Sequence, residues 1–270
     1  MLIFPNCKIN IGLQILNKRI DGYHAIETLL VPIKYLCDII EIKESKTFEF
    51  RTGIDSTYIY PNNLCVKAYN LLKQAYCLPL VSIYLHKRIP IGAGLGGGSA
   101  DAAFSLLLLN KLFKLNLDNK ELKRFAQKLG SDCAFFIENK TALGIDKGDV
   151  ISPIDVPILN DKYIYIIKPS IHIKTAKAYE LVKPTMPDIM LRELITLPIE
   201  SWKDAVINDF EKIMFVKHPE LQIIKTMLFQ QGAIYASMSG SGSSVYGIFK
   251  EKPLVNKNFP ADYFQWIGKL

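Results

Sequence analysis

A glycine-rich run in the first half of the chain constrains its fold more than any other feature. Residues 90–103 read PIGAGLGGGSADAA, and four of the six positions from 94 to 99 are glycine. Glycine loses more conformational freedom on folding than other residues, so such a run is costly unless the backbone must bend tightly there. Residues 104–115 are rich in leucine and other good helix formers. The pattern predicts a tight loop that opens directly into a helix.

A loop of this kind favours an anion. The first N–H groups of a helix have no partner within the helix, and the helix dipole attracts negative charge, so the sequence predicts a phosphate site. The run lacks the Gly-Lys-Ser/Thr ending of a Walker A loop. Gly92, Gly94 and Gly97 satisfy GxGxxG, but a second helix at 118–129 follows where a dinucleotide fold needs a strand. A structural turn without a ligand remains the alternative.

The rest of the chain mixes strand and helix patterns. Apolar residues alternate through 8–15, which predicts a half-buried strand with Lys8 and Asn10 together on its polar face. We expect further strands at 38–43, 47–51, 81–85 and 163–167, and helices at 61–75, 175–182, 188–197 and 219–230. A short element at 133–137 follows the 118–129 helix, and residues 236–249 predict two strands joined by a glycine-rich turn. The order predicts an α+β fold, and prolines at 152–157 suggest domains at 1–154 and 155–270.

Composition limits the class of protein. The net charge of +7 suits an anionic substrate, but no block of five like charges suggests a basic tail. The five cysteines form no CxxC pair, which favours a reducing compartment, and we expect a cytoplasmic protein. The apolar stretch that opens the sequence is interrupted by Pro5, so it is too short for the core of a signal peptide. No apolar run approaches the length of a membrane span.

Several segments together resemble the GHMP kinases, a superfamily of small-molecule kinases. The carriers of the resemblance are residues 90–103, Lys8-Ile-Asn10, Arg19-x-Asp-Gly-Tyr-His24 with Glu27-Thr28, Gly130-Ser-Asp132-x-x-Phe-Phe, and Met238-Ser-Gly-Ser-Gly-Ser. They occur in family order over nearly the whole chain. The resemblance implies a two-domain GHMP kinase fold. Its amino-terminal domain is ribosomal-protein-S5-domain-2-like, and its carboxy-terminal domain is a ferredoxin-like α+β domain.

The resemblance also implies a reaction, the transfer of the γ-phosphoryl group of ATP to a hydroxyl group. The Asp-Gly-Tyr-His segment is similar to that of members with a cytidine-containing acceptor. We therefore expect phosphorylation of the 2-hydroxyl of a cytidine diphosphate-linked polyol, in the non-mevalonate route to isoprenoid precursors. ATP and this polyol are the expected partners, with Mg²⁺ carried by ATP. We expect no nucleic acid or membrane partner, and a monomer or homodimer.

Two residues match the catalytic positions of the family. Asp132 corresponds to the base that accepts the hydroxyl proton, and Lys8 to the lysine beside it. A nearby ammonium keeps the carboxylate ionised and favours the alkoxide as it forms. Considered without the resemblance, Asp132 is better explained as an N-cap after a helix end, and Lys8 as an ordinary solvated lysine.

The acceptor and ATP have their own candidate residues. Aromatic stacking and edge hydrogen bonds suit a pyrimidine. The resemblance assigns the acceptor to Asn10, Tyr23, His24, Thr175, Tyr179, Gly240 and Gly242. It assigns ATP to Asn63, Lys87, Pro90, Gly92, Gly94, Leu95, Gly96, Gly97, Gly98, Ser99 and Ala100. Three of these have simpler interpretations: Asn63 as an N-cap, Lys87 as a surface charge and Tyr179 as a core aromatic.

Three other functions remain open at this point. Another kinase of the superfamily would act on homoserine, mevalonate or a sugar, and would lack a cytidine site at Tyr23 and His24. A basic nucleic-acid-binding module fits the charge, but the chain has no arginine cluster or aromatic-basic interleaving. An ATP-binding regulator without activity is disfavoured by the presence of Lys8 and Asp132.

Overall fold

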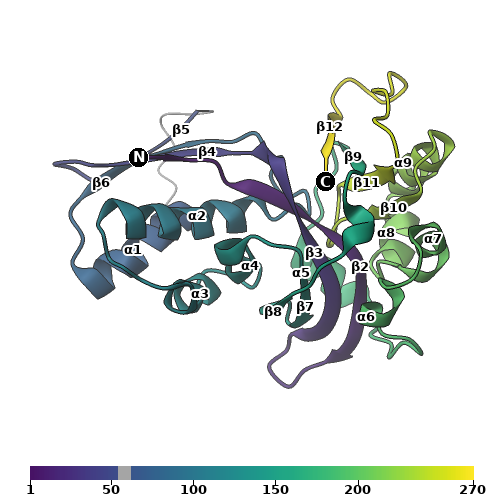
Figure 1. Cartoon of the computed structure of the whole chain (residues 1–270), viewed down its shortest axis with the longest axis horizontal. Coiled ribbons are helices and arrows are strands. Elements are labelled where there is room, and N and C mark those ends of the chain that lie inside the picture. The colour runs from purple at the N-terminus through teal and green to yellow at the C-terminus, as the bar shows by residue number, and fades with distance from the viewer. Residues whose placement is uncertain (54–61) are drawn as a thin grey trace. The chain divides into compact units, whose positions relative to one another are not determined.

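The structure, a computed structural model, describes residues 1–53 and 62–270. It divides into two compact units (Figure 1). The first contains Met1–Cys7, Leu36–Ile91 and Gly96–Lys140, and the second contains Lys8–Tyr35, Gly92–Leu95 and Thr141–Leu270. Both units are discontinuous in sequence. The predicted division into domains at residue 154 stays a prediction.

The first unit is a mixed sheet with helices on one face. Its strand order is β1-β4-β6-β5, with β5 parallel to β6 and the other pairs antiparallel. The strands are β1 (Leu2–Ile3), β4 (Ile39–Glu44), β5 (Glu49–Thr52) and β6 (Val81–His86). The helices are α1 (Leu64–Tyr76), α2 (Gly97–Leu112), α3 (Asn119–Gln127) and α4 (Cys133–Glu138). Alternate residues of β6 are buried, and Figure 1 shows α1 and α2 running along this sheet.

The second unit contains two sheets. One has the order β2-β3-β7-β8 and the other β10-β11-β9-β12. The strands are β2 (Asn6–Lys18), β3 (His24–Cys37), β7 (Ala142–Asp146), β8 (Val150–Pro153), β9 (Tyr163–Lys168), β10 (Tyr235–Met238), β11 (Val245–Phe249) and β12 (Phe264–Lys269). The divisions between the units fall inside β2, after Cys7, and inside β3, after Tyr35.

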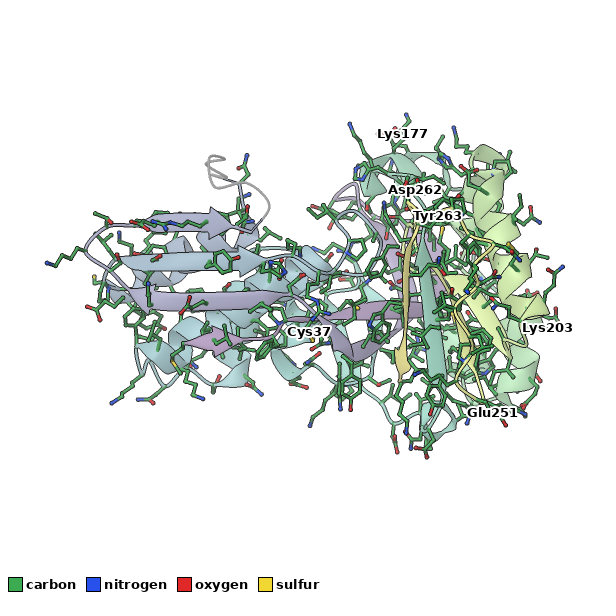
Figure 2. The ribbon with its side chains drawn as sticks, turned by 90° about the horizontal axis from the view of Figure 1, so that it is seen from above. Cys37, Lys177, Lys203, Glu251, Asp262 and Tyr263 are labelled. Atoms are coloured by element: carbon green, nitrogen blue, oxygen red, sulfur yellow. The ribbon has the colours of Figure 1, made fainter. Side chains whose placement is uncertain are left out.

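Short helices complete the second unit. They are α5 (Thr175–Leu181), α6 (Leu191–Leu194), α7 (Trp202–Ala205), α8 (Glu211–Lys217) and α9 (Pro219–Gln230), with 3₁₀ turns η1 (Pro157–Leu159) and η2 (Ile199–Ser201). Leu221, Ile224 and Leu228 of α9 pack into a core shared with Tyr165 and Val245 of the sheet. Charged side chains such as those of Lys177, Lys203 and Glu251 extend outward (Figure 2).

The helix after the glycine run begins earlier than the sequence predicts. It starts at Gly97, inside the run, and ends at Leu112 rather than spanning 104–115. Gly96 precedes it with a φ of 69°, a left-handed conformation that glycine adopts without steric cost. The last glycines of the run are therefore the first turn of α2.

Two other expectations need correction. The helix predicted at 188–197 shrinks to α6, since Pro187 and Pro198 bracket the segment. The predicted polar face of β2 is buried rather than exposed, and Lys8 and Asn10 are each 4% exposed. Residues 94 and 95 and the turn after β10 bond to this part of β2. Pro61, the predicted start of the first helix, lies outside the described residues, and α1 begins at Leu64.

Candidate functional site

In the second unit, the glycine run approaches the turn that joins β10 to β11. Gly94 has a φ of 75°, and a Cβ atom there would lie 2.1 Å from the carbonyl oxygen of Ser239. The Oγ of Ser239 donates to the Gly94 carbonyl at 2.9 Å, and the N–H of Ser244 donates to Ala93 at 3.1 Å. Only glycine at position 94 permits this approach of two backbone segments.

Lys8 is buried beside this contact. Its Nζ donates to Asn10 Oδ1 at 2.5 Å and to the Gly94 carbonyl at 3.3 Å, and its N–H donates to the Leu95 carbonyl at 2.9 Å. Burying an ammonium is costly unless it is hydrogen-bonded, and these acceptors meet that requirement. Lys8 is thus a positioned cation against the glycine run, and the interpretation as an ordinary solvated lysine is wrong.

Asn10 connects Lys8 to the centre of the unit. Its Nδ2 donates to Thr28 Oγ1 at 3.0 Å, and Thr28 donates to the Gly12 carbonyl at 2.7 Å. Its N–H donates to Ser239 Oγ at 3.2 Å, and its carbonyl accepts from Tyr246 OH at 2.8 Å. Because the side-chain Nδ2 of Asn10 donates to Thr28, the Oδ1 of the same amide faces Lys8 and accepts from it. Asn10 therefore orients the lysine.

The turn between β10 and β11 is fixed by two residues that sequence reasoning missed. Asn208 is fully buried, and its Nδ2 donates to the carbonyls of Met238 and Gly240 at 2.7 and 2.8 Å. Glu211 accepts from the N–H of Met238 at 2.8 Å and from Ser237 Oγ at 2.9 Å. The available signal was the polar Asn-Asp-x-Glu pattern of 208–211 within an apolar surrounding, which by itself resembles a helix start.

The same turn meets the predicted acceptor residue Thr175. Its Oγ1 lies 2.9 Å from Ser241 Oγ. Gly242 has a φ of 92°, and a Cβ atom there would lie 2.7 Å from the Met238 sulfur. A Gly240 Cβ would lie 3.3 Å from Asn10 Oδ1. In this unit the structure therefore brings together Lys8, Asn10, Gly94, Leu95, Gly240 and the neighbourhood of Thr175.

Gly92 lies at the edge of this group. Its φ is 65°, and a Cβ atom there would lie 2.5 Å from the imidazole of His172. Pro90 belongs to the first unit and is half-buried. The run thus contributes residues to both units.

Two of the predicted cytidine residues, His24 and Tyr179, form a separate aromatic group in the second unit. His24 and Tyr179 stack, with ring centroids 5.1 Å apart, and Phe210 contacts Tyr179 edge-on at 4.9 Å. Partial burial lowers the pKa of His24, and the charge of Lys18 lowers it further, so the imidazole is neutral at pH 7. Tyr23 is 61% exposed, with Lys147 Nζ 5.2 Å from its ring centroid.

The spacing of these rings restricts how a base could bind. A ring inserted between His24 and Tyr179 needs a separation of about 7 Å, two van der Waals contacts. Because the two rings touch each other, a pyrimidine would stack on an outer face or separate them. Tyr179 is also part of the surroundings of the core, as its simpler interpretation predicted.

In the first unit, the start of α2 supplies backbone donors that have no acceptor within the helix. The N–H of Ala100 bonds to the Gly96 carbonyl at 2.9 Å, the first helical bond of α2. The N–H groups of Gly97, Gly98 and Ser99 precede it and so have no acceptor within the helix. This is the arrangement that suits a phosphate group.

Asn63 caps a helix, as its simpler interpretation predicted. Its Oδ1 accepts from the N–H of Cys65 at 2.8 Å at the start of α1. Whether it also contacts a nucleotide stays a prediction.

Lys87 is not a surface charge. Its Nζ makes ion pairs with the buried carboxylates of Asp38 and Asp101, the latter at 2.7 Å. Burial lowers the pKa of Lys87, but the charges of Asp101 and Asp38 outweigh burial and raise it. A Gly97 Cβ would lie 3.3 Å from Lys87 Nζ, so the ammonium lies against the first turn of α2.

Asp132 stands at the start of α4, at the N-cap position. Its φ and ψ are −75° and −13°, and within the described chain its side chain accepts no capping hydrogen bond. The N–H of Cys133 donates instead to the Gly130 carbonyl at 3.2 Å. Asp132 belongs to the first unit and Lys8 to the second.

No group of three His, Cys, Asp or Glu side chains suited to a metal ion occurs among residues 1–53 and 62–270. In the same residues, no helix is long and apolar enough to span a membrane.

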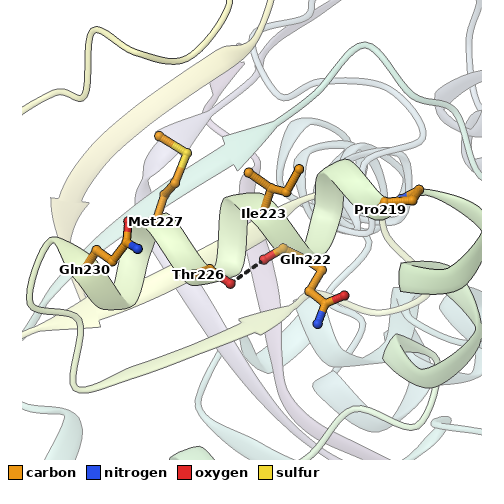
Figure 3. Close-up of a pocket in the computed structure, with 6 residues that line it drawn as sticks. All are labelled: Pro219, Gln222, Ile223, Thr226, Met227 and Gln230. Carbon is orange, nitrogen blue, oxygen red and sulfur yellow. Dashed lines mark hydrogen bonds between the residues drawn. The ribbon is translucent and has the colours of Figure 1, made fainter.

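A shallow hollow of about 350 Å³ lies along α9 between Pro219 and Gln230 (Figure 3). Thr226 there bonds to the Gln222 carbonyl of its own helix at 3.0 Å. No charged side chain lines this hollow.

Comparison with known families decides between the open interpretations. Two family models match, the GHMP kinases N terminal domain over residues 63–140 and the GHMP kinases C terminal domain over residues 189–257. The chain belongs to the GHMP kinases. The first match contains the glycine run from residue 90, α2 and Asp132, and the second contains Asn208 and the turn after β10.

Two relatives of this GHMP kinase carry the same name. A 4-diphosphocytidyl-2-C-methyl-D-erythritol kinase of Cytophaga hutchinsonii is 48% identical over 255 residues, 94% of each chain. A protein of the same name from Azobacteroides pseudotrichonymphae is 47% identical over 269 residues, 98% of this chain and 100% of the relative.

Solved structures confirm the two-domain α+β fold of this GHMP kinase. A crystal structure of 4-(cytidine 5'-diphospho)-2C-methyl-D-erythritol kinase is 30% identical, with a TM-score of 0.78 over 92% of this chain and 90% of that one. A mevalonate kinase reaches a TM-score of 0.71 over 92% of this chain and 91% of its own. At 15% identity, that second likeness shows the fold alone.

Proposed function

We propose that this chain phosphorylates the 2-hydroxyl of 4-diphosphocytidyl-2-C-methyl-D-erythritol with ATP, giving the 2-phosphate and ADP, in the non-mevalonate route to isoprenoid precursors. The observation that carries this proposal is the likeness over nearly the full length to relatives with this name, at 47–48% identity for the two described above. The buried ammonium of Lys8 against the glycine run supports the same chemistry.

The glycine run binds the phosphates of Mg-ATP in this proposal. The N–H groups of Gly97, Gly98 and Ser99 face no helical acceptor, and phosphate oxygens fill that role. Magnesium enters with ATP as part of the substrate, held by phosphate oxygens and water, and it neutralises charge on the transferred group. Within the second unit, the carbonyl of Gly94 accepts from the ammonium of Lys8 and the carbonyl of Leu95 accepts from its backbone N–H, so the run itself holds this cation.

Phosphoryl transfer then needs a base and an ordered cation. The acceptor oxygen attacks the γ-phosphorus, its proton passes to the carboxylate of Asp132, and the bond to the β-phosphate oxygen breaks to release ADP. Lys8 stabilises negative charge on the acceptor and the transferred group, with Asn10 holding the ammonium in its direction. Gly240 and Gly242 bring backbone close to the phosphates of the acceptor.

The aromatic group binds the cytosine end of the acceptor. Tyr23 offers an exposed ring, and His24 is a neutral imidazole that can donate or accept at the edge of a base. Tyr179 supports His24 by stacking, and Thr175 lies at the turn that carries Gly242. These placements support the predicted roles of the four residues in acceptor binding.

An acceptor panel tests the proposal. Purified protein is incubated with Mg-ATP and, in separate reactions, 4-diphosphocytidyl-2-C-methyl-D-erythritol, homoserine, mevalonate and galactose, and ADP release is measured. We expect release only with the cytidine-containing alcohol, and inhibition by CMP that competes with it. Turnover of another alcohol, with no effect of CMP, would reject the proposed substrate.

A further inference from the structure

A buried charge cluster lies in the first unit beneath the glycine run. It consists of Asp38, Lys87 and Asp101, whose side chains are 0%, 12% and 5% exposed. One ammonium is shared by two carboxylates, so the cluster holds one more negative group than it has cations. Within residues 1–53 and 62–270, Asp101 Oδ1 is buried with no hydrogen-bond partner. Uneven buried charge is costly, which calls for an explanation beyond packing.

The cluster joins the two ends of the run. Asp38 Oδ1 accepts from the N–H groups of Arg88 and Ile89 at 2.6 and 2.8 Å, the residues that lead into Pro90. Asp101 lies in the second turn of α2, the helix that leaves the run. Lys87 links the two carboxylates and lies against Gly97. Asp38 thereby holds the backbone that leads into the run directly, and the start of α2 through Lys87 and Asp101.

We propose that Asp38 is a positioning residue for the nucleotide, which holds the base of the phosphate loop and, through Lys87 and Asp101, makes ATP binding depend on pH. This inference rests on the proposed function, because it takes the run to be the ATP site. Asp38 itself does not touch ATP. It acts through the backbone of 88–89 and through the ammonium of Lys87.

The pH dependence follows from the charges around Asp101. Burial raises the pKa of Asp101 to about 7, Lys87 opposes this, and the charge of Asp38 adds to it. Two thiols also face the cluster, Cys65 of α1 and Cys37 beside Asp38, and burial raises the pKa of both, so both stay neutral. The guanidinium of Arg88, whose N–H bonds to Asp38, carries a fixed positive charge. Bound polyphosphate adds negative charge nearby and favours the neutral form of Asp101. ATP binding therefore takes up a proton and weakens as pH rises through 7.

Replacing Asp38 separates geometry from charge. Asp38→Asn keeps an oxygen that can accept from Arg88 and Ile89 but removes the negative charge that raises the pKa of Asp101. Asp38→Ala removes both the oxygen and the charge. Asp101→Asn removes the titrating group. Asp118→Ala is the matched control, since it removes a helix cap of α3 in the same unit, away from the run.

The experiment is calorimetric titration of the full chain with Mg-ATP from pH 6 to 8.5, in two buffers of different ionisation enthalpy. We expect proton uptake by the unmodified protein and about tenfold or more weaker binding in Asp38→Ala. In Asp38→Asn the pH at which affinity falls should move to a lower value. In Asp101→Asn the extra proton uptake should be absent. Asp118→Ala should lower the melting temperature and leave the affinity unchanged.

The outcomes separate two failures. If the unmodified protein does not bind Mg-ATP, the proposed function is wrong. If it binds, but both Asp38 variants match its affinity and its pH curve, the positioning role is wrong. Should Asp38→Ala fail to fold, the pH curve of Asp38→Asn decides alone, because a purely structural role would not displace it.

Discussion

Asp132 is the residue on which the proposed proton transfer depends. It stands at the start of α4, where its carboxylate does not serve as the helix cap in the described structure. We expect Asp132→Asn to lower kcat by about 10²–10⁴, the usual contribution of a positioned base. Mg-ATP affinity should stay the same, because the variant removes a proton acceptor and keeps the shape.

Steady-state kinetics together with equilibrium ATP binding measure this prediction. Glu138→Gln is its matched control, since Glu138 lies at the other end of the same helix and pairs with Lys123 at 2.5 Å. The control should turn over at nearly the normal rate. An Asp132→Asn variant as fast as the unmodified protein would remove Asp132 from the base role.

Gly94 makes a second prediction at the residue scale. Ala at this position combines a φ of 75° with a Cβ atom 2.1 Å from a backbone oxygen. We expect Gly94→Ala to lower the free energy of unfolding by about 2–5 kcal/mol, from a left-handed alanine and overpacking, and to reduce activity strongly. Urea denaturation and the kinase assay measure the two effects.

Gly232→Ala isolates the backbone contribution. Gly232 has a φ of 93°, and no atom lies within 4 Å of the position that a Cβ would take, so only the conformational cost of about 1–2 kcal/mol applies. Equal losses of stability in the two variants would show that the contact between Gly94 and Ser239 carries no weight.

Residue-level prediction from sequence succeeded where chemistry and backbone conformation limit the choice. The glycine run indicated tight backbone bends, and the structure has positive φ angles at Gly92, Gly94 and Gly96. The burial of Lys8 could not be foreseen, because its partners at residues 94 and 95 are far away in sequence. Asp38 gave no signal at all, since a lone aspartate before a strand has no pattern.

At the scale of elements, Asn208 holds the turn between β10 and β11. Asn208→Ala would leave the carbonyls of Met238 and Gly240 buried without their donor. Each unsatisfied buried group costs about 1–3 kcal/mol, so we expect a loss of about 2–5 kcal/mol in the free energy of unfolding. Activity should fall as well, because Ser239 loses its fixed place beside Gly94 and Asn10.

Urea denaturation compares this variant with Asn17→Ala. Asn17 is exposed and makes a long bond of 3.5 Å to Lys18, so its replacement should change stability by less than about 0.5 kcal/mol. If the two asparagine variants were equally stable, the hydrogen bonds of Asn208 would be unimportant for the turn.

Element prediction depended on how regular the burial pattern is. Strand β6 alternates buried and less buried residues and was expected at nearly its observed bounds. Strand β3 went unpredicted, because eight consecutive residues from Ile26 to Ile33 are buried and the alternating signal is absent. Helix α9 was expected at its observed bounds, since Pro219 starts it and Gly232 follows its end.

At the scale of the whole molecule, the buried Asp101 affects stability as a function of pH. Its carboxyl has a pKa near 3.8 when unfolded and a raised pKa when folded, chiefly because of burial. Between these values the folded state binds more protons, so this group reduces stability as pH rises from about 4 to 7. Asp101→Asn should remove that part of the dependence.

The free energy of unfolding at pH 5 and pH 8 checks the sign. When the pH rises from 5 to 8, the free energy of unfolding of Asp101→Asn should increase relative to that of the unmodified protein, by on the order of 1–4 kcal/mol. If the free energy of unfolding changed with pH by the same amount in both proteins, Asp101 would have the same pKa in the folded and unfolded states.

The bonds that fix Lys8 and Asn10 join the beginning of the chain to its far end. The N–H of Asn10 bonds to Ser239 and its carbonyl to Tyr246, at sequence separations of 229 and 236 residues. A ribosome has therefore made most of the protein before the first strand finds these partners. Until residues 239 and 246 have been made, the nascent chain lacks both bonds that hold Asn10, the residue that orients Lys8, so we expect activity only after this part of the chain has folded.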